Sequence, residues 1–374
     1  GTPFNGQTVF VSPTVNNNPN LLPEQNHSYE IGTELSFFKS RVGLDVTYYN
    51  ARSINQIMPI TVSSASGYSQ FYVNGGTIQN SGFEVALHLV PLRTTNFSWN
   101  MDVNWSKNSN KVISLYNNQP SYIISTYQNS VQLVAEKGKS TGIIRGSGYT
   151  YLNGKPVVDT SGSYLKATGL VDVGNTKPDW IGGINNTFTY KNLALSFLVD
   201  MSHGGQLYSL DLDYGASGGL TPHTAGKNAL GGEVRGSLAS GGGMIFPGVT
   251  ADGKVNTKRV DASDFHNGAF PFSSLFSETT QTYIYDASWI KLRELAITWS
   301  FPKKLMEKLN YVKGIDLSLT GKNLWIIHKN LPYSDPEQGV ATGSGTSGQN
   351  GSIGYQSGAY PVYRTFGFNV RVKF

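Results

Sequence analysis

The sequence predicts an all-β fold, a transmembrane antiparallel β-barrel, and three observations lead to this prediction. Large apolar side chains alternate with polar ones over segments that approach the roughly 9–11 tilted residues needed to cross a bilayer. The composition combines 14% charged and 12% aromatic residues with 43 glycines, which suits many strands joined by loops. The connections between these segments alternate between short and long, as they do in outer-membrane barrels.

The last segment, residues 363–374, shows the clearest alternation. Its even positions carry large apolar side chains, namely Phe366, Phe368, Val370, Val372 and Phe374. Because successive side chains of a strand point to opposite faces, one face of this segment is apolar and the other is polar. The segment ends on Phe374, an aromatic residue of the kind found where a membrane strand meets the interface.

Two hairpins come first along the chain. Residues 27–38 and 41–50 alternate on either side of a short turn, and residues 80–92 and 97–106 do so across Thr94 and Thr95. Their apolar rows are rich in the aromatic and branched residues that favour strands: Tyr29, Ile31, Leu35 and Phe37; Val42, Leu44, Val46 and Tyr48; Phe83, Val85, Leu87 and Leu89; Phe97, Trp99, Met101, Val103 and Trp105.

Four further segments follow before the last one. Residues 180–190 and 193–201 form a hairpin around Asn192, and residues 288–301 and 315–324 are joined by 302–313, where we expect one helical turn. Lys291 and Arg293 share the parity of the apolar Leu295, Ile297, Trp299 and Phe301. We therefore expect a β-bulge or the outer rim of the membrane near these two charges.

The lengths of the connections separate a barrel from a soluble β-sandwich. The connections at 39–40, 93–95, 191–192 and 302–313 are short, whereas those at 51–79, 107–179, 203–283 and 325–360 are long. A sandwich has no reason to place every long loop at one end. We therefore expect the long loops to be extracellular and the C-terminus to be periplasmic, with residues 1–26 as an extracellular loop segment rich in Asn, Pro and Gly.

The totals exclude several other classes of protein. The mean hydropathy is -0.25 and no apolar run approaches the roughly 18 residues of a helical membrane span. The net charge is +5, but Lys and Arg are scattered singly or in pairs, so we expect no nucleic acid partner. The absence of cysteine excludes disulfides and thiolate metal sites, and we expect neither a metal nor a cofactor.

The number of predicted strands is odd. Nine strands contrast with the even number found in single-chain bacterial barrels, and nine alone would leave two open edges in lipid. We therefore expect residues 27–374 to be the C-terminal portion of a larger barrel, whose N-terminal part lies outside this chain.

Several segments of the sequence resemble, in the same order, the C-terminal part of the SusC/RagA-like TonB-dependent outer-membrane transporters of Bacteroidota. They are residues 18–38, 41–52, 74–87, 97–115, 148–165, 174–208, 286–302, 317–324, the DPE motif at 335–337, and 360–374. The resemblance implies that the nine strands are the last of a barrel of about 22. It also implies active import of oligomeric nutrients, glycans or peptides, driven through TonB.

The resemblance further implies several partners. They are the missing N-terminal part with its plug domain and TonB box, TonB itself through that part, a SusD-like surface lipoprotein as lid, and outer-membrane lipid and lipopolysaccharide. Neither a plug nor a TonB box is recognisable in this chain. An alternative is a non-transporting, SusC-like scaffold subunit of a larger outer-membrane complex.

Candidate site residues lie on the polar strand face and in the long loops. The predicted lumen-facing polar residues are Asp45, Glu84, Asp102 and Asp200, which line a solute path or merely solvate the wall. The predicted substrate-binding aromatics are Tyr72, Tyr122, Tyr149 and Tyr208, unless they pack the loops or contact the lid.

Two expectations concern catalysis and assembly. His88 and Glu84 share one strand face but stand about 13 Å apart by strand rise, too far for a hydrogen bond, and we expect no catalytic residues and no enzyme activity. The resemblance suggests that the assembly machinery reads the C-terminal aromatic, Phe374, as its signal.

Overall fold

Nine long strands form a single antiparallel sheet, which confirms the all-β prediction. The computed structural model describes residues 3–4, 7–8, 14–262, 279–306, 311–338, 354–358 and 362–374, so parts of the predicted loops 1–26, 203–283 and 325–360 lie outside the described residues. The strands are β4 (Gln25–Phe37), β5 (Val42–Thr61), β6 (Gln70–Arg93), β7 (Phe97–Leu115), β14 (Pro178–Tyr190), β15 (Leu193–Gly204), β18 (Trp289–Ser300), β19 (Gly314–Lys329) and β21 (Thr365–Lys373). Each predicted alternating segment corresponds to one of them.

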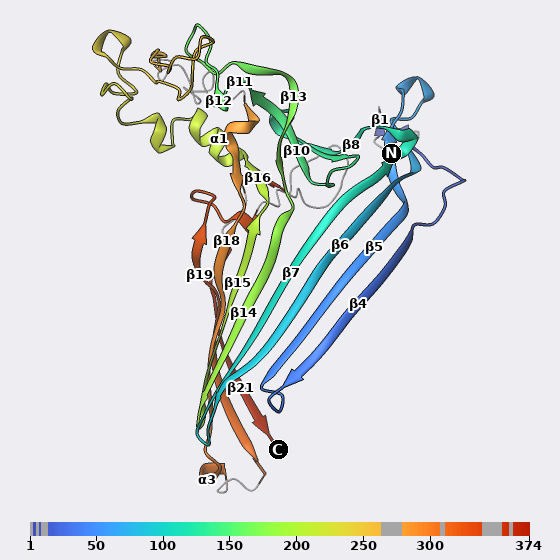
Figure 1. Cartoon of the computed structure of the whole chain (residues 1–374), viewed down its shortest axis with the longest axis vertical. Helices are drawn as coiled ribbons and strands as arrows, with labels where there is room; N and C mark the ends of the chain where they lie inside the picture. The colour runs from blue at the N-terminus through green and yellow to red at the C-terminus, as the bar shows by residue number, and fades with distance from the viewer. Residues whose placement is uncertain are drawn as a thin grey trace.

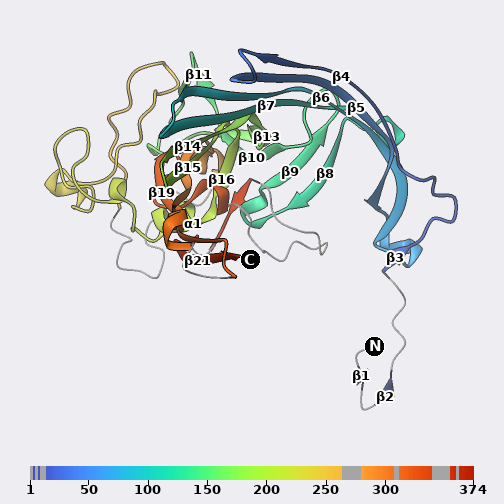
Figure 2. The ribbon, with the colours of Figure 1, turned by 90° about the horizontal axis from the view of Figure 1, so that it is seen from below.

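The sheet is a curved wall that does not close on itself. Its order is β21-β19-β18-β15-β14-β7-β6-β5-β4, so each strand pairs with its neighbours along the chain, as in an up-and-down barrel. Seen along the strands, the wall forms an arc (Figure 2), with β4 and β21 as its two edges. Both edges leave backbone groups free to pair with further strands.

The apolar side chains align from strand to strand on one face. In register, Trp99 lies opposite Phe188, and the row continues through Leu195, Ile297, Leu319 and Phe368. The rings of Trp99 and Phe188 stack with their centroids 5.4 Å apart. A row of large apolar groups across six strands, with Phe368 65% exposed, forms the kind of surface that lipid covers in a barrel.

A β-bulge lies where the sequence predicted one. The register between β15 and β18 shifts between Leu198 and Val199, so that Arg293 is the extra residue on β18. The bulge reverses the parity above it. Lys291 therefore lies opposite Asp200 on the polar face, although it shares the parity of the apolar Leu295 and Ile297 below.

The short connections and the long ones lie at opposite ends of the wall (Figure 1). The turns after β4, β6 and β14 are short, and the connection from β18 to β19 begins with α3 (Lys303–Met306), the expected helical turn. Two strands are longer than expected, because β5 and β6 continue through 51–61 and 70–79 of the range 51–79, which the sequence assigned to a loop. Backbone hydrogen bonds between strands do not require alternating apolar side chains. The two strands therefore stay paired beyond the point where the alternation in the sequence ends.

The long connections between β7 and β14, β15 and β18, and β19 and β21 contain more structure than the sequence indicated. Four strands form a second sheet, in the order β13-β10-β9-β8: β13 (Lys166–Asn175), β10 (Ile143–Tyr149), β9 (Gln132–Glu136) and β8 (Ser121–Thr126). A three-stranded sheet combines β17 (Ile284–Asp286), β16 (Gln206–Ser209) and β20 (Tyr355–Gln356), next to the helix α1 (Leu210–Ser217). We call these elements and the loops around them the loop body.

Further short elements complete the described structure. They are β1 (Pro3–Phe4), β2 (Gln7–Thr8), β3 (Val15–Asn16), β11 (Tyr151–Leu152), β12 (Lys155–Pro156), and the single 3-10 turns Ser64–Ser66, Tyr116–Asn118, Gln128–Ser130, Pro222–Thr224, Leu238–Ser240, Thr280–Tyr283 and Pro336–Gln338. No helix within the described residues is both long enough and apolar enough to cross a membrane.

The loop body has a hydrophobic core of its own. Its buried members come from connections far apart in the chain and include Ile144, Leu207, Phe246, Leu331 and Tyr355. Sequence periodicity could not reveal this core, because each short segment contributes only a few apolar side chains.

Candidate functional site

A row of polar and small residues crosses the face opposite the apolar row. In register, Glu34 lies opposite Asp45, and the row continues through Ala86, Asn104, Gly183, Asp200 and Lys291. Directly opposite side chains in an antiparallel pair have their Cβ atoms about 4.5–5.5 Å apart. The seven strands from β4 to β18 therefore present one continuous polar strip.

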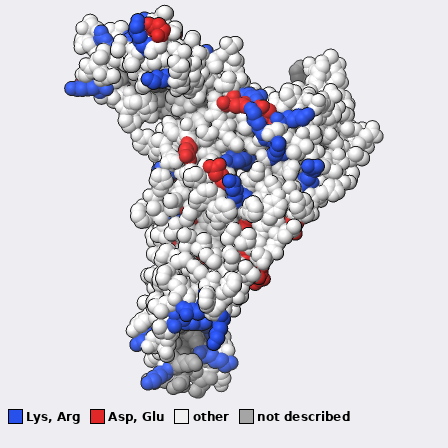
Figure 3. Space-filling view, in the orientation of Figure 1, with Lys and Arg blue, Asp and Glu red and all other residues white. Residues whose placement is uncertain are grey.

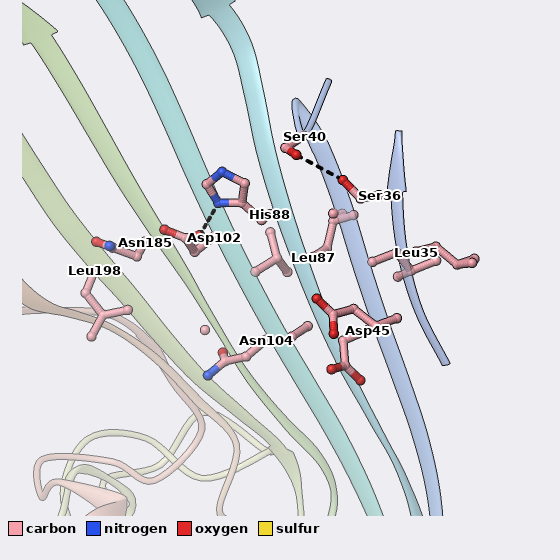
Figure 4. A pocket seen from close by; sticks show the side chains of 16 residues that line it. Leu35, Ser36, Ser40, Asp45, Leu87, His88, Asp102, Asn104, Asn185 and Leu198 are labelled. Atoms are coloured by element: carbon pink, nitrogen blue, oxygen red, sulfur yellow. Dashed lines mark hydrogen bonds and ion pairs between the residues drawn. The ribbon is translucent and has the colours of Figure 1, made fainter. Parts of the chain in front are cut away.

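Two cavities on this face bring the four predicted lumenal residues together. The larger one, of about 490 Å³, is lined by Asp45 and Asp102 (Figure 4). The second, of about 460 Å³, is lined by Asp45, Glu84 and Asp200. Side chains from six neighbouring strands line the larger cavity, which requires that it lie on the concave side of the curved sheet.

The sequence analysis did not predict one contact in the larger cavity. His88 Nδ1 lies 2.6 Å from Asp102 Oδ1, across the β6–β7 pair (Figure 4). A register shift between Leu89 and Leu92, around Pro91, sets this pairing, since proline cannot donate to the ladder and is tolerated at bulges. The short turn between β6 and β7 indicated that these strands pair. Because of the bulge, however, counting residues outward from the turn would assign His88 the wrong partner on β7.

Glycine gives the wall room for larger side chains. A Cβ at Gly82 would lie 2.7 Å from the hydroxyl oxygen of Tyr49. Without that Cβ, the Tyr49 ring lies across β6 and its hydroxyl donates to Asn108 Oδ1 at 2.9 Å on β7. This hydrogen bond ties three strands together on the polar face.

Five charged residues form a compact cluster at the upper end of the wall. We call the cluster of Asp200, Lys291, Arg293, Asp335 and Glu337 the ionic latch. Lys291 Nζ lies 2.5 Å from both Asp335 Oδ1 and Glu337 Oε2. Arg293 joins Asp200 at 2.9 Å to Glu337 at 2.7 Å. The latch therefore fastens residues 335–337 of a long connection to β15 and β18.

Lys291 and Asp335 are the most buried members of the ionic latch, and the other three are partly exposed. Lys291 is only 4% exposed, and its ammonium group lies 4.9 Å from the centroid of the Trp289 ring. The guanidinium of Arg293 lies 5.0 Å from the same ring. Buried charges need partners, and these two cations have three carboxylates around them. The sequence showed Asp335 and Glu337 only as part of a family motif, and it did not show their role.

The two cations of the ionic latch lower the pKa of Glu337. Burial alone would raise the pKa of its carboxyl, but the hydrogen bonds from Arg293 and Lys291 and the charges of these two cations together hold the pKa below its ordinary value of 4.5. A carboxyl with a depressed pKa stabilises the folded state above its ordinary pKa, and that stability is lost as the pH falls through the depressed value.

The ionic latch should therefore open in acid. We expect hydrogen exchange of residues 330–338, corrected for the intrinsic rate, to be slow at pH 6 and to accelerate as the pH falls below 4.5. Glu337→Gln should remove most of this pH step. A step of unchanged size in that variant would show that another group controls the segment.

The predicted substrate-binding tyrosines are not brought together in one site. Tyr72 lies on β6, and Tyr122 on β8 donates its hydroxyl to the carbonyl of Pro59 at 2.7 Å. Tyr122 packs against the small buried cluster of Val112, Leu115 and Ala135. Both rings are partly buried where the wall meets the loop body, so their role in substrate binding stays a prediction.

Tyr149 and Tyr208 lie deeper in the loop body. Tyr149 packs against Tyr164 with ring centroids 4.4 Å apart, and burial raises its pKa. Tyr208 is fully buried and its hydroxyl donates to Asp213, so its ring is inaccessible to a ligand in this structure. Both residues pack within the loop body, and the role of Tyr149 and Tyr208 in substrate binding stays a prediction.

Phe374 follows directly after β21 and is 78% exposed. The C-terminus lies toward the end of the wall that carries the short turns (Figure 1). Its role as an assembly signal stays a prediction.

Comparison with protein families gives a match over most of the chain. Residues 2–324 match the family described as TonB dependent receptor-like, beta-barrel. The TonB-dependent receptor P26 of Formosa agariphila is 25% identical over 390 residues, which cover 96% of this chain and 35% of that protein. The TonB-dependent receptor SusC of Bacteroides thetaiotaomicron is 24% identical over 213 residues, covering 51% of this chain and 20% of SusC.

Solved structures share the fold. A chain of the RagAB peptide transporter matches with a TM-score of 0.65 at 16% identity, covering 94% of this chain and 35% of that chain. The RagAB peptide importer in its 'open-open' state matches with a TM-score of 0.67 at 15% identity. The chain spans about a third of the length of the first of these relatives.

Proposed function

This chain belongs to the TonB-dependent receptor-like β-barrel family, and from this premise we propose that the complete protein is an active transporter of the bacterial outer membrane. In it, the nine strands supply the C-terminal part of the barrel wall. The apolar face meets lipid, the polar face meets the lumen, the long connections are extracellular and the short turns are periplasmic.

The observation that carries this proposal is the polar row on the concave face. Residues from Glu34 to Lys291 give seven adjacent strands a continuous polar surface, and the two cavities of about 490 and 460 Å³ open along it. Backbone groups in the wall are paired between strands, as the hydrocarbon core of a membrane requires. Such a wall suits a path for polar solutes, and Asp45 and Glu84 have no ion-pair partner among the described residues.

We propose oligomeric nutrients, glycans or peptides, as the imported substrates. Support comes from the similarity to SusC and from the fold shared with the RagAB peptide transporter. Tyr72, Tyr122 and Tyr149 offer partly buried rings at the end of the wall that carries the long connections, where sugar rings or peptide side chains could stack. A SusD-like lipoprotein would cap the loop body at this end.

Energy coupling gives the test of this function. We expect cells that depend on the complete protein to take up and grow on its oligomeric substrate only when TonB is present. Uptake of the corresponding monomer, small enough for porins, serves as the control and should not depend on TonB.

Two results would contradict active transport. Uptake of the oligomer that is unchanged in cells lacking every TonB homologue would indicate passive diffusion. A complete protein that assembles with outer-membrane partners but changes no uptake would favour the scaffold role instead.

A further inference from the structure

Basic side chains gather at the end of the wall that carries the short turns. Blue side chains without red neighbours mark this lower end in Figure 3. We define the basic rim as the Lys and Arg whose described side chains lie in the short connections or within three residues of their strand ends: Lys39, Arg41, Arg93, Lys191, Lys304, Lys313, Arg371 and Lys373. Among the described residues in the same range, Asp316 is the acidic one. The basic rim thus carries more positive charge than the chain's formal net charge of +5.

Only part of this charge is used within the chain. Lys373 Nζ lies 3.0 Å from Asp316 Oδ2, and the guanidinium of Arg41 donates to the carbonyls of Val90 and Pro91 at 3.1 and 2.9 Å. The other members include Lys39, Arg93, Lys191, Lys304 and Lys313, which are exposed and form no ion pair with any described carboxylate. Every short connection therefore has at least one unneutralised cation within it or at its edge.

Large apolar side chains lie directly beside these cations. Phe38 is 78% exposed, Tyr190 is 55% exposed and Trp299 is 42% exposed, all at the same end of the wall. The ammonium group of Lys191 lies 5.4 Å from the centroid of the Tyr190 ring. Aromatic rings at the membrane interface and Lys stems that extend past them place the charged groups at the depth of lipid headgroups.

We propose that the basic rim binds the phosphate groups of anionic phospholipids in the leaflet that the short turns face. The inference rests on the proposed placement of the wall in the outer membrane. The cations are distributed one turn after another along the arc of the wall, which matches a layer of separate headgroups. A nucleic acid or a single polyanionic ligand would instead require a compact cluster.

The test compares two matched variants of the complete protein. The rim variant combines Lys39→Gln, Arg93→Gln, Lys191→Gln and Lys313→Gln, one change in each short connection. The control variant combines Lys107→Gln, Lys111→Gln, Lys155→Gln and Lys227→Gln, which are exposed positions away from the short turns. Each protein is placed in phosphatidylcholine vesicles, and the association of spin-labelled phosphatidylglycerol is measured relative to spin-labelled phosphatidylcholine at low and high salt.

The wild type and the control variant should prefer phosphatidylglycerol, and this preference should weaken with salt. The rim variant should lose it, by up to about fivefold for each charge removed at low ionic strength. Equal preference in the rim variant and the wild type would overturn the proposal. Stronger competition by lipid A than by phosphatidylglycerol at the rim would overturn it as well.

The lipid measurement does not depend on transport. Heat-modifiable migration in gels first confirms that each variant is a folded barrel. A folded protein that shows the lipid preference but no TonB-dependent uptake would refute the transporter and leave the basic rim intact. A folded transporter without the preference would refute the basic rim alone.

Discussion

Deletion of Thr365–Phe374 from the complete protein is expected to abolish its assembly in the outer membrane. These residues contain β21, whose nine residues pair with β19 and whose other edge has no partner strand among the described residues. Without β21, β19 becomes an edge in lipid, and each unpaired backbone group there costs several kcal/mol. Heat-modifiable protein in purified outer membranes measures the outcome, which should fall below detection as the chain is degraded in the periplasm.

A deletion that touches no strand pairing controls for the loss of residues. Ser64–Gly67 form the exposed tip between β5 and β6, and their removal should leave assembly nearly unchanged. Phe374→Asp keeps the ladder of β21 and should only slow assembly if Phe374 is the signal. Normal assembly of the chain without β21 would mean that this strand does not close the barrel.

Replacing Lys291 with alanine should be among the most destabilising single substitutions in the chain. The change leaves Asp335 without its cation and Glu337 with Arg293 alone, in a site where Lys291 is 4% exposed. Removing one partner of a buried ion pair typically costs about 3–5 kcal/mol. Urea unfolding of the complete protein in lipid vesicles should show a loss of this order, with faster hydrogen exchange in residues 330–338.

Lys322 provides the matched control on the neighbouring strand. Its ammonium group lies 3.8 Å from Glu294, and its side chain is 61% exposed. Lys322→Ala should cost at most about 1 kcal/mol, the usual range for an exposed ion pair. If Lys291→Ala costs no more than Lys322→Ala, the ionic latch does not hold the loop to the wall. A smaller loss in the double variant Lys291→Ala with Asp335→Asn would show that unpaired charge causes the damage.

The strands of the wall could be predicted because apolar and polar side chains alternate along them with a period of two residues. In the segment Phe97–Trp105, for example, apolar and polar side chains alternate at every position. The alternation of short and long connections predicted that neighbouring strands run antiparallel, as the sheet order confirms. Two charges on an apolar parity indicated either a bulge or the outer rim of the membrane, and the register shift at Arg293 shows that a bulge is present. The loop body could not be predicted, since its core joins single residues such as Ile144, Leu207 and Leu331 from distant connections.

For the candidate site, the sequence could predict only which face of its strand each residue lies on. Parity placed Asp45, Glu84, Asp102 and Asp200 on one face, where the structure brings them to two cavities. The alternation could not predict the partners of Asp102 and Asp200, because β-bulges shift the register of β6 with β7 and of β15 with β18. The sequence indicated aromatic residues in the long loops but not how they pack, and Tyr208 is fully buried because the loop body forms a core of its own.

The central claim, that one face of these strands meets lipid and the other meets an aqueous lumen, is tested most directly by scanning β7. The sequence contains no cysteine, so single cysteines at residues 97–106 provide unique sites in this chain for a spin label. In the complete protein in lipid vesicles, labels at Trp99, Met101 and Val103 should collide mainly with oxygen dissolved in lipid. Labels at Asn100, Asp102 and Asn104 should collide mainly with a water-soluble nickel chelate, which gives a period of two. Access of the nickel chelate to both sets alike, or a period of two with the opposite phase, would contradict the placement of this wall in the membrane.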